Sequence, residues 1–252
     1  MNESSMSTTS NLIRVNQEGK TESVTHRLIQ MIDLGLFSEG QQLPNETALA
    51  TQLGVATVTL RDALAVLRER GVIETRRGRN GGSFICASPK VSDQDLFDQL
   101  REMSPLELRD LADEHAAILG AAARLAAQRA GPEQHARLAT LIDALVSAED
   151  RRERRRANAR FHIEVAVAAQ SVRLTHCEAR LQAELGDVGE LLWLPCANQP
   201  DIHSVEWEHK AILEAIVANN ANLAGALAEA HVARGIRHLS ALRLQQIAQG
   251  ES

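Results

Sequence analysis

The apolar residues of the first ninety positions predict short helices followed by a hairpin. One helix is expected within residues 21–37, with Val24 and Leu28 on its apolar side. A second is expected to begin after Asn45, a residue type that caps helices well, and to end at Gly54, which supplies a turn. This spacing indicates two helices of a small domain that share one core.

A third helix and a hairpin complete this region. Leu60, Leu64 and Leu67 form one apolar stripe over residues 57–70, which predicts a helix with a polar opposite face. Residues 71–85 predict two short strands around a basic, glycine-rich tip. Helix, tight turn, helix and basic hairpin in this order predict a winged helix-turn-helix, whose last helix fits the major groove of DNA.

Beyond residue 92 the pattern changes to long, alanine-rich helices. Strand-type alternation of β-branched residues is absent, which predicts an all-α bundle. The fold class is therefore mainly α: an N-terminal winged helix-turn-helix with a small β-hairpin wing, plus a C-terminal all-α helical bundle. We expect helices at residues 93–103, 105–130, 132–149, 151–169, 172–192, 202–219 and 221–247.

These patterns divide the 252 residues into four predicted parts. Pro89 prevents the second wing strand from continuing, so a linker is expected where it stands. The parts are a flexible N-terminal tail (1–20), a DNA-binding domain (21–86), a linker (87–92) and an all-α domain (93–247).

Charge is distributed unevenly along the chain, whose formal net charge is −6. Residues 57–90 hold 7 basic and 3 acidic side chains, a net charge of +4, whereas residues 91–252 hold 17 basic and 24 acidic ones, a net charge of −7. Positive charge thus lies where the third helix and the wing are predicted, as a phosphate-binding surface requires.

Other features of the composition indicate a cytoplasmic protein with no membrane partner. No run approaches the ~18 apolar residues that a membrane span needs, and the first eleven residues are polar and lack an export signal. Three widely spaced cysteines fit a reducing compartment and no disulfide framework.

The predicted third helix and wing supply the candidates for DNA contact. A guanidinium one turn into the helix, at Arg61, reaches guanine O6 and N7 or a phosphate, and threonine hydroxyls donate to phosphates. Two adjacent glycines let the wing backbone approach the minor groove. The alternative is a solvated arginine face, but the preceding helices favour DNA binding. The candidates are Thr57, Thr59, Arg61, Arg76, Arg77, Arg79, Gly81 and Gly82.

Several short motifs of this region match a known signature. They are Leu43-Pro44-Asn45-Glu46-Thr47, Leu49-Ala50, Gly54-Val55-Ala56-Thr57 and Leu60-Arg61-Asp62-Ala63-Leu64. With the basic wing that follows, they make the chain resemble the GntR family of bacterial transcription regulators. Thr47 and Thr57 stand where family members commonly have arginines at the DNA. The resemblance therefore implies a different operator preference and more binding by the wing.

Histidines concentrate in the helical region, where eight of the nine lie. Three of them, His162, His209 and His231, stand on apolar helix faces, and Asn158 precedes His162 by one helical turn. Imidazoles on inward faces of a bundle can converge on a divalent metal. By spacing alone, a core histidine with satisfied hydrogen bonds is the commoner outcome for each.

A second resemblance bears on these histidines. Phe161-His162, Glu208-His209-Lys210-Ala211-Ile212 and Ala230-His231-Val232 match the pattern of the helical FCD effector domain, found in the FadR-type branch of the GntR family. This implies that residues 93–246 hold a divalent metal, Zn or Ni, beneath a pocket for a small carboxylate. Its ligands would be Asn158, His162, His209 and His231. Asn158 stands at an aspartate position, which implies weaker metal binding or a metal-free site.

Two further residues are candidates for effector binding. Alignment with the alanine-rich stretch of the FCD pattern puts His115 where an arginine is common, so it either faces the ligand or is structural. Arg234 lies one turn from His231 and is either a carboxylate anchor or a surface arginine. The run Arg151–Arg156 is expected to be a solvated face with local ion pairs.

These observations predict a ligand-responsive bacterial transcription regulator, by default a repressor, that binds a palindromic operator as a homodimer. Two alternatives belong to other classes. One is a metal-dependent hydrolase or oxygenase tethered to a DNA-binding head, which lacks a general base directed at the histidines. The other is an architectural DNA-binding protein without an effector. We therefore expect no catalytic residues.

Overall fold

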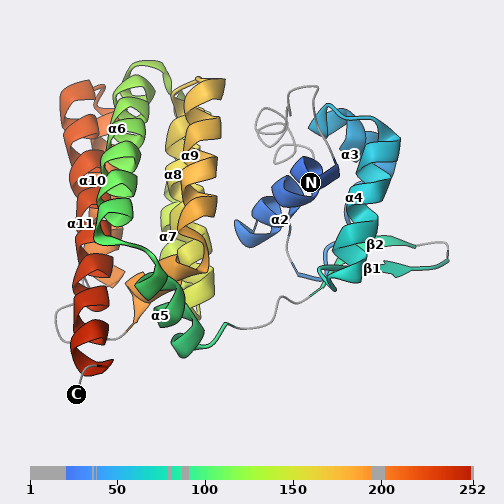
Figure 1. The fold of residues 1–252 in the computed structure, drawn as a ribbon. Coiled ribbons are helices and arrows are strands. Elements are labelled where there is room, and N and C mark those ends of the chain that lie inside the picture. Colours follow the sequence, from blue (N-terminus) through green and yellow to red (C-terminus); the bar gives the residue numbers. More distant parts are fainter. Residues whose placement is uncertain are drawn as a thin grey trace. The chain divides into compact units, whose positions relative to one another are not determined.

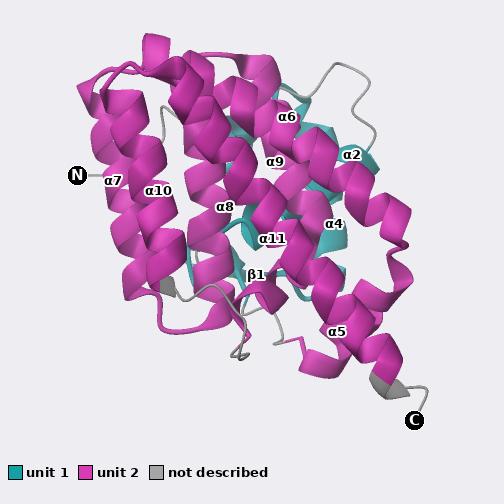
Figure 2. Cartoon of the chain, turned by 90° about the vertical axis from the view of Figure 1, so that its left-hand side faces the viewer, with its two compact units in different colours: residues 1–90 teal, residues 91–252 magenta. Residues whose placement is uncertain are grey.

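The computed structural model describes residues 21–35, 37, 39–78, 81–86, 91–194 and 202–250. This part of the chain is mainly helical and has a two-stranded antiparallel hairpin near its N-terminal end (Figure 1), which confirms the predicted fold class. The chain splits into two compact units, residues 1–90 and residues 91–252 (Figure 2). The expected tail at residues 1–20 and positions 87–90 of the expected linker lie outside the described residues.

The first unit consists of three helices and a hairpin, with α2 and α3 packed on α4 and α4 packed on the hairpin. Buried leucines from all three helices form its core, and Leu28, Leu49 and Leu60 are fully buried. Ile73 pairs with Ile85 and Arg76 with Gly82 across the antiparallel strands. The elements are α2 (Thr21–Asp33), α3 (Glu46–Leu53), α4 (Thr57–Glu69), β1 (Ile73–Arg76) and β2 (Gly82–Ile85).

The turn between α3 and α4 is set by local hydrogen bonds. Asn45 Oδ1 accepts a hydrogen bond from the backbone N–H of Ala48 at 2.9 Å and so caps α3. Gly54 ends the helix with φ 68°, a left-handed conformation that favours glycine. The N–H of Val55 then donates to the carbonyl of Ala50 at 3.0 Å. These contacts fix where α4 begins.

The second unit is a helical bundle whose helix ends, apart from the end of α9, agree with the sequence prediction to within about three residues. Its caps are those that the sequence provides: Ser104 and Glu107 form a capping box, and Asp150 caps the helix that follows it. The helices are α5 (Asp93–Glu102), α6 (Pro105–Arg129), α7 (Pro132–Ser147), α8 (Arg151–Ala168), α9 (Val172–Leu185), α10 (Ile202–Val217) and α11 (Ala221–Gly250), with the 3-10 helix η2 (Gly186–Trp193) after α9.

One predicted helix was wrong in its extent. Residues 172–192 were expected to form a single α-helix, but α9 ends at Leu185. Gly186 adopts φ 53° and ψ −146°, a conformation that an α-helix does not contain. The chain continues from there as the 3-10 helix, and Val188, Leu191 and Trp193 are buried in it.

Helices α6 and α11 lie side by side at close range (Figure 1). A Cβ atom at Gly120 would lie 2.5 Å from the side chain of Glu229, and one at Gly225 would lie 2.5 Å from that of Arg124. Arg124 and Glu229 instead pair across the contact at 2.7 Å. Buried alanines continue this interface and allow the helices to approach closely: Ala122, Ala123, Ala126, Ala127, Ala224 and Ala228.

Among the described residues, no helix is both long enough and apolar enough to cross a membrane.

Candidate functional site

The beginning of α4 carries three of the predicted DNA-contacting residues. Thr57 and Thr59 are half-buried, whereas the side chain of Arg61 is 63% exposed. The guanidinium of Arg61 donates to Glu46 Oε2 on α3 at 3.0 Å. An exposed pair of this kind contributes little to stability. A phosphate or a base edge can therefore take the place of Glu46 without unfolding the helix pair.

The hairpin carries the other predicted arginines. Arg76 pairs with Glu74 at 2.7 Å, and its guanidinium lies 4.3 Å from the centre of the Phe84 ring. Arg77, directly after β1, is exposed. Arg79 lies outside the described residues. The wing thus holds one arginine against its own surface and presents a second one to solvent.

Gly81 and Gly82 are required by the hairpin itself. A Cβ atom at Gly81 would lie 2.5 Å from the carbonyl oxygen of Arg76, and Gly82 adopts φ 153°. Gln42 Nε2 donates to the carbonyl of Gly81 at 2.8 Å and occupies the space beside Gly82. The sequence analysis explained the two glycines only by close approach of the wing backbone to the minor groove. It missed Gln42, because no local sequence pattern connects this residue to the wing.

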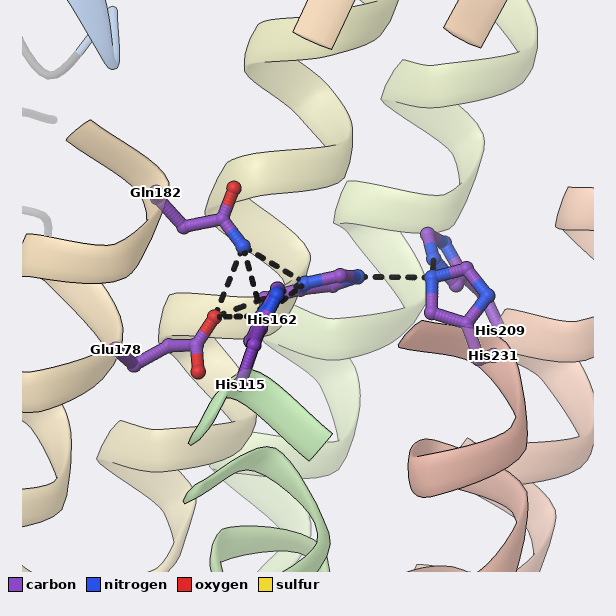
Figure 3. Close-up of polar contacts among 6 residues, drawn as sticks. All are labelled: His115, His162, Glu178, Gln182, His209 and His231. Atoms are coloured by element: carbon purple, nitrogen blue, oxygen red, sulfur yellow. Dashed lines mark hydrogen bonds and ion pairs between the residues drawn. The ribbon is translucent and has the colours of Figure 1, made fainter. Parts of the chain in front are cut away.

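A cluster of buried polar side chains lies within the second unit (Figure 3). His162 on α8 is at its centre, with its Nε2 2.9 Å from Nε2 of His231 on α11. Nε2 of His209 on α10 lies 3.3 Å from the same atom of His231. His209 is fully buried and stacks on Phe161, with ring centres 3.9 Å apart. The three histidines singled out in the sequence are therefore neighbours.

The spacing of these nitrogens fits a shared metal ion. Zinc binds imidazole nitrogen at about 2.0–2.1 Å, which places two ligand atoms of a tetrahedral site about 3.3 Å apart. The ligand nitrogens of His162, His209 and His231 all lie within 4.8 Å of one another. Asn158 is buried one turn before His162 and lines the same cavity. The residues present can therefore hold a divalent ion.

Glu208 orients one of the three imidazoles. Its Oε2 lies 2.6 Å from Nδ1 of His231, and its other oxygen pairs with Arg234. A carboxylate at Nδ1 stabilises the tautomer that leaves Nε2 free to bind a metal. The sequence analysis named no carboxylate directed at the histidines, but Glu208 is one, and this residue is only 6% exposed. Arg234 is thus held by an ion pair with Glu208, and its role as a carboxylate anchor stays a prediction.

The opposite edge of His162 faces helices α6 and α9. His115 Nε2 lies 2.9 Å from Glu178 Oε1, and Gln182 Nε2 lies 2.8 Å from His162 Nδ1. Sequence reasoning missed both Glu178 and Gln182. The one signal for them was their separation by four residues, which places them on one face of α9.

Burial controls the protonation of this cluster. It lowers the pKa of His162 and of His231 to about 4, and it lowers the pKa of His209 well below the ordinary value. Burial by itself would raise the pKa of Glu178, but His115 and then His162 hold it well below its usual range. At neutral pH the cluster thus offers neutral imidazoles and an ionised carboxylate, the forms that bind metals.

A cavity of about 50 Å³ adjoins the cluster. It accommodates roughly four water molecules, or a small organic molecule of similar size. Its polar wall contains both predicted effector residues, His115 and Arg234, together with Asn158, His162, Glu208 and His231, and its apolar wall includes Leu185, Trp193 and Val205.

The arginine run at the start of α8 is not the solvated face that the sequence suggested. Arg155 is only 5% exposed, and its Nη1 lies 3.6 Å from Asp187 of the 3-10 helix. Arg151 pairs with Asp93 at the start of α5. Part of the run faces inward because η2 packs against α8, an arrangement that a charge pattern alone does not reveal.

Comparison with known proteins identifies the domain family of each unit. The family described as "Bacterial regulatory proteins, gntR family" matches residues 20–84, and the FCD domain family matches residues 110–234. A Mycobacterium gastri protein named as the HTH-type transcriptional regulator RmpR is 41% identical over 222 residues, which cover 87% of this chain and 80% of that protein. The chain belongs to the GntR family of bacterial regulators. Its first unit is the GntR winged helix, and its second contains the FCD domain.

Two other proteins are similar to this GntR-family chain. One, from Escherichia coli K12 and named as an L-lactate dehydrogenase operon regulatory protein, is 30% identical over 220 residues, covering 84% of this chain and 83% of that protein. The solved structure of a GntR family regulator from Pseudomonas syringae pv. tomato is 17% identical, covers 98% of each chain and has a TM-score of 0.47.

Membership of this family decides between the classes of function. A GntR-family protein with an FCD domain is a DNA-binding transcription regulator and not an enzyme. The alternative of a metal-dependent enzyme tethered to a DNA-binding head is therefore not supported.

Replacing Arg61 by alanine is expected to weaken operator binding by about 1–3 kcal/mol, the range for loss of an arginine contact to a base. Fluorescence anisotropy with an operator selected from a random DNA pool measures the effect. Arg173→Ala, at an exposed arginine on α9, is the matched control and should leave the Kd unchanged. Equal Kd values for Arg61→Ala and the wild type would show that Arg61 does not contact the operator.

The metal-free protein is expected to lose stability as the pH falls from about 6.5 to about 4. Unfolded histidines take up protons near pH 6.5, whereas folded His162 and His231 stay neutral down to about 4. The unfolded state therefore binds more protons in this window. The free energy of unfolding should fall by up to roughly 1.4 kcal/mol per pH unit for each of these histidines.

Urea denaturation with a chelator, repeated across this pH range, measures that slope. His231→Leu should reduce the slope, while His26→Gln, at an exposed histidine of α2, should not change it. A free energy of unfolding that stays constant between these pH values would contradict the burial of neutral histidines.

Proposed function

We propose that this regulator is a repressor that binds a palindromic operator as a homodimer and releases it when a small carboxylate binds beside a metal ion in the helical unit. The observation that carries the proposal is the convergence of three buried, neutral imidazoles beside a cavity that Asn158 and Arg234 also line. Burying so many polar groups is unfavourable for a helical bundle. A binding function explains why the chain contains them.

The charges around the cavity make effector binding depend on the metal. When bound, a divalent ion supplies positive charge and an open position for an oxygen ligand. Glu208 and Arg234 offset each other as an ion pair, while Glu178 is an ionised carboxylate beside His162, whose charge is suppressed by burial. Without the ion, a carboxylate would enter a site that already holds the ionised Glu178, which is unfavourable.

Arg234 is the side chain best placed to meet the carboxylate of an effector. It lies on the cavity wall with 37% of its side chain exposed and pairs with Glu208 through one nitrogen. A guanidinium has five N–H donors, so this pairing leaves donors for a second carboxylate. Arg234 thus orients the effector, while Glu208 fixes both Arg234 and His231.

The names of relatives support the class of effector. One relative is named for an L-lactate dehydrogenase operon, and L-lactate is a small hydroxycarboxylate of a size that the cavity accepts. The hydroxyl and carboxylate oxygens of such a molecule suit a site with one metal ion and one arginine. Small hydroxycarboxylates are therefore the first compounds to screen.

Effector binding is proposed to change operator affinity through the arrangement of the two winged-helix domains of a homodimer. Two winged helices related by a two-fold axis match the inverted halves of a palindrome at a fixed spacing. The cavity is bordered by side chains of α6, α8, α10 and α11, so a ligand there favours one packing of these helices. It shifts the operator equilibrium only as far as its affinity differs between the two arrangements.

Operator release by small carboxylates, measured with and without metal, tests this function. The zinc-loaded protein should release a selected operator when L-lactate or a related hydroxycarboxylate is added, and the chelated protein should not. Arg234→Ala should raise the effector concentration needed by about tenfold or more, a typical allosteric coupling, with the Kd for the operator unchanged when no effector is present. Arg173→Ala is again the control.

Three results would contradict parts of the proposal. Tighter operator binding with the effector would make the protein an activator rather than a repressor. An equal response after chelation would remove the metal from the mechanism. No response to any small carboxylate would favour the architectural alternative.

A further inference from the structure

A second set of ligand-type atoms surrounds the Nδ1 edge of His162, opposite the edge that faces His231 (Figure 3). The set consists of His115 Nε2, Glu178 Oε1, the side-chain amide of Gln182 and His162 Nδ1 itself. The six distances between these four atoms range from 2.8 to 3.7 Å. Ligand atoms around a tetrahedral zinc ion are about 3.3 Å apart. The four atoms therefore outline a coordination site.

Glu178 supplies an independent sign that a cation belongs there. Its side chain is fully buried, and its Oε2 has no hydrogen-bond partner among the described residues. No lysine or arginine in that part of the chain forms an ion pair with it. A buried carboxylate oxygen without a partner is strongly unfavourable. A cation between the four atoms would compensate the negative charge, and a carboxylate can bind a cation through both of its oxygens.

The chemistry of the four side chains suits a transition metal. The oxygen and nitrogen of a glutamine amide exchange places by a half-turn of the group. With Gln182 Oε1 turned inward, the set becomes two imidazole nitrogens, one carboxylate oxygen and one amide oxygen. Imidazole ligands favour ions such as zinc, nickel and cobalt. Glu178 also adds a negative charge to this set, whereas Asn158, on the other side of His162, is neutral.

A hydrogen-bonded network without any ion is the competing interpretation. In that network Gln182 donates to Nδ1 of His162, whose Nε2–H donates to His231, and Nδ1–H of His231 donates to Glu208. This chain of hydrogen bonds satisfies His162 and His231, but it leaves Oε2 of Glu178 without a partner. An ion at the second site removes that deficiency.

We propose that His115, Glu178, Gln182 and the Nδ1 edge of His162 form a second site for a divalent transition-metal ion. It lies across the His162 ring from the site of His209 and His231. Its geometry supports this second site whether or not the first site senses an effector. A neutral imidazole has one free lone pair. Both sites fill together only when His162 releases its remaining ring proton to solvent and bridges the two ions as an imidazolate.

Metal content in variants that disable one site at a time tests this proposal. His209→Leu removes a ligand of the first site and keeps the core apolar. After incubation with zinc and removal of free metal, it should retain about one equivalent per chain, as expected for a single four-ligand site. Adding Glu178→Gln to that variant should abolish binding, because the carboxylate is lost while its size is kept. Adding Glu164→Gln, at a buried carboxylate that pairs with Arg137, should not.

The outcomes separate this proposal from the proposed function. No zinc in His209→Leu overturns the second site, and so does zinc that persists after Glu178→Gln is added. Glu178→Gln alone tests the first site, which should still hold about one equivalent. If His209→Leu does not fold by circular dichroism, His231→Leu disables the same first site and is measured in its place. Absorption of bound cobalt reports the ligand geometry in each variant.

Discussion

Burial of ionisable groups at the centre of an alanine-rich bundle is the constraint on which the helical unit depends. Small side chains bring α6 and α11 close together, and His115, His162 and His231 are buried inside the bundle. Each polar atom there needs a partner from the protein or from a bound ion. The arrangement of five helices around His162 follows from this requirement.

The same burial explains why the site is suited to sensing. Imidazoles with a pKa of about 4 are neutral in the cell and keep their lone pairs for a metal or for one another. Glu208 links this metal-binding edge to Arg234, which borders the cavity. A ligand that meets Arg234 therefore acts on side chains from α10 and α11 at once. In the proposed function, this is the physical route by which a small molecule would change helix packing.

Local sequence signals predicted the fold well because they report local physics. Asn45 caps α3, Gly54 turns the chain, and the leucine stripe of α4 forms the core, each as its position indicates. The partners that complete the histidine cluster were missed for the opposite reason. Glu178 lies 63 residues from His115 and Glu208 lies 23 residues from His231, so only the folded bundle shows which carboxylate meets which imidazole. Likewise, the apolar periodicity predicted one helix over residues 172–192, whereas in the structure α9 ends just before Gly186.

Anomalous X-ray diffraction at the zinc absorption edge, from crystals grown with zinc and from crystals grown with chelator, tests the central claim most directly. A metal-sensing FCD site predicts a peak about 2.1 Å from the Nε2 atoms of His162, His209 and His231, absent from the chelated crystals. Zinc crystals with no peak at these histidines, their nitrogens hydrogen-bonded only to one another, would contradict it.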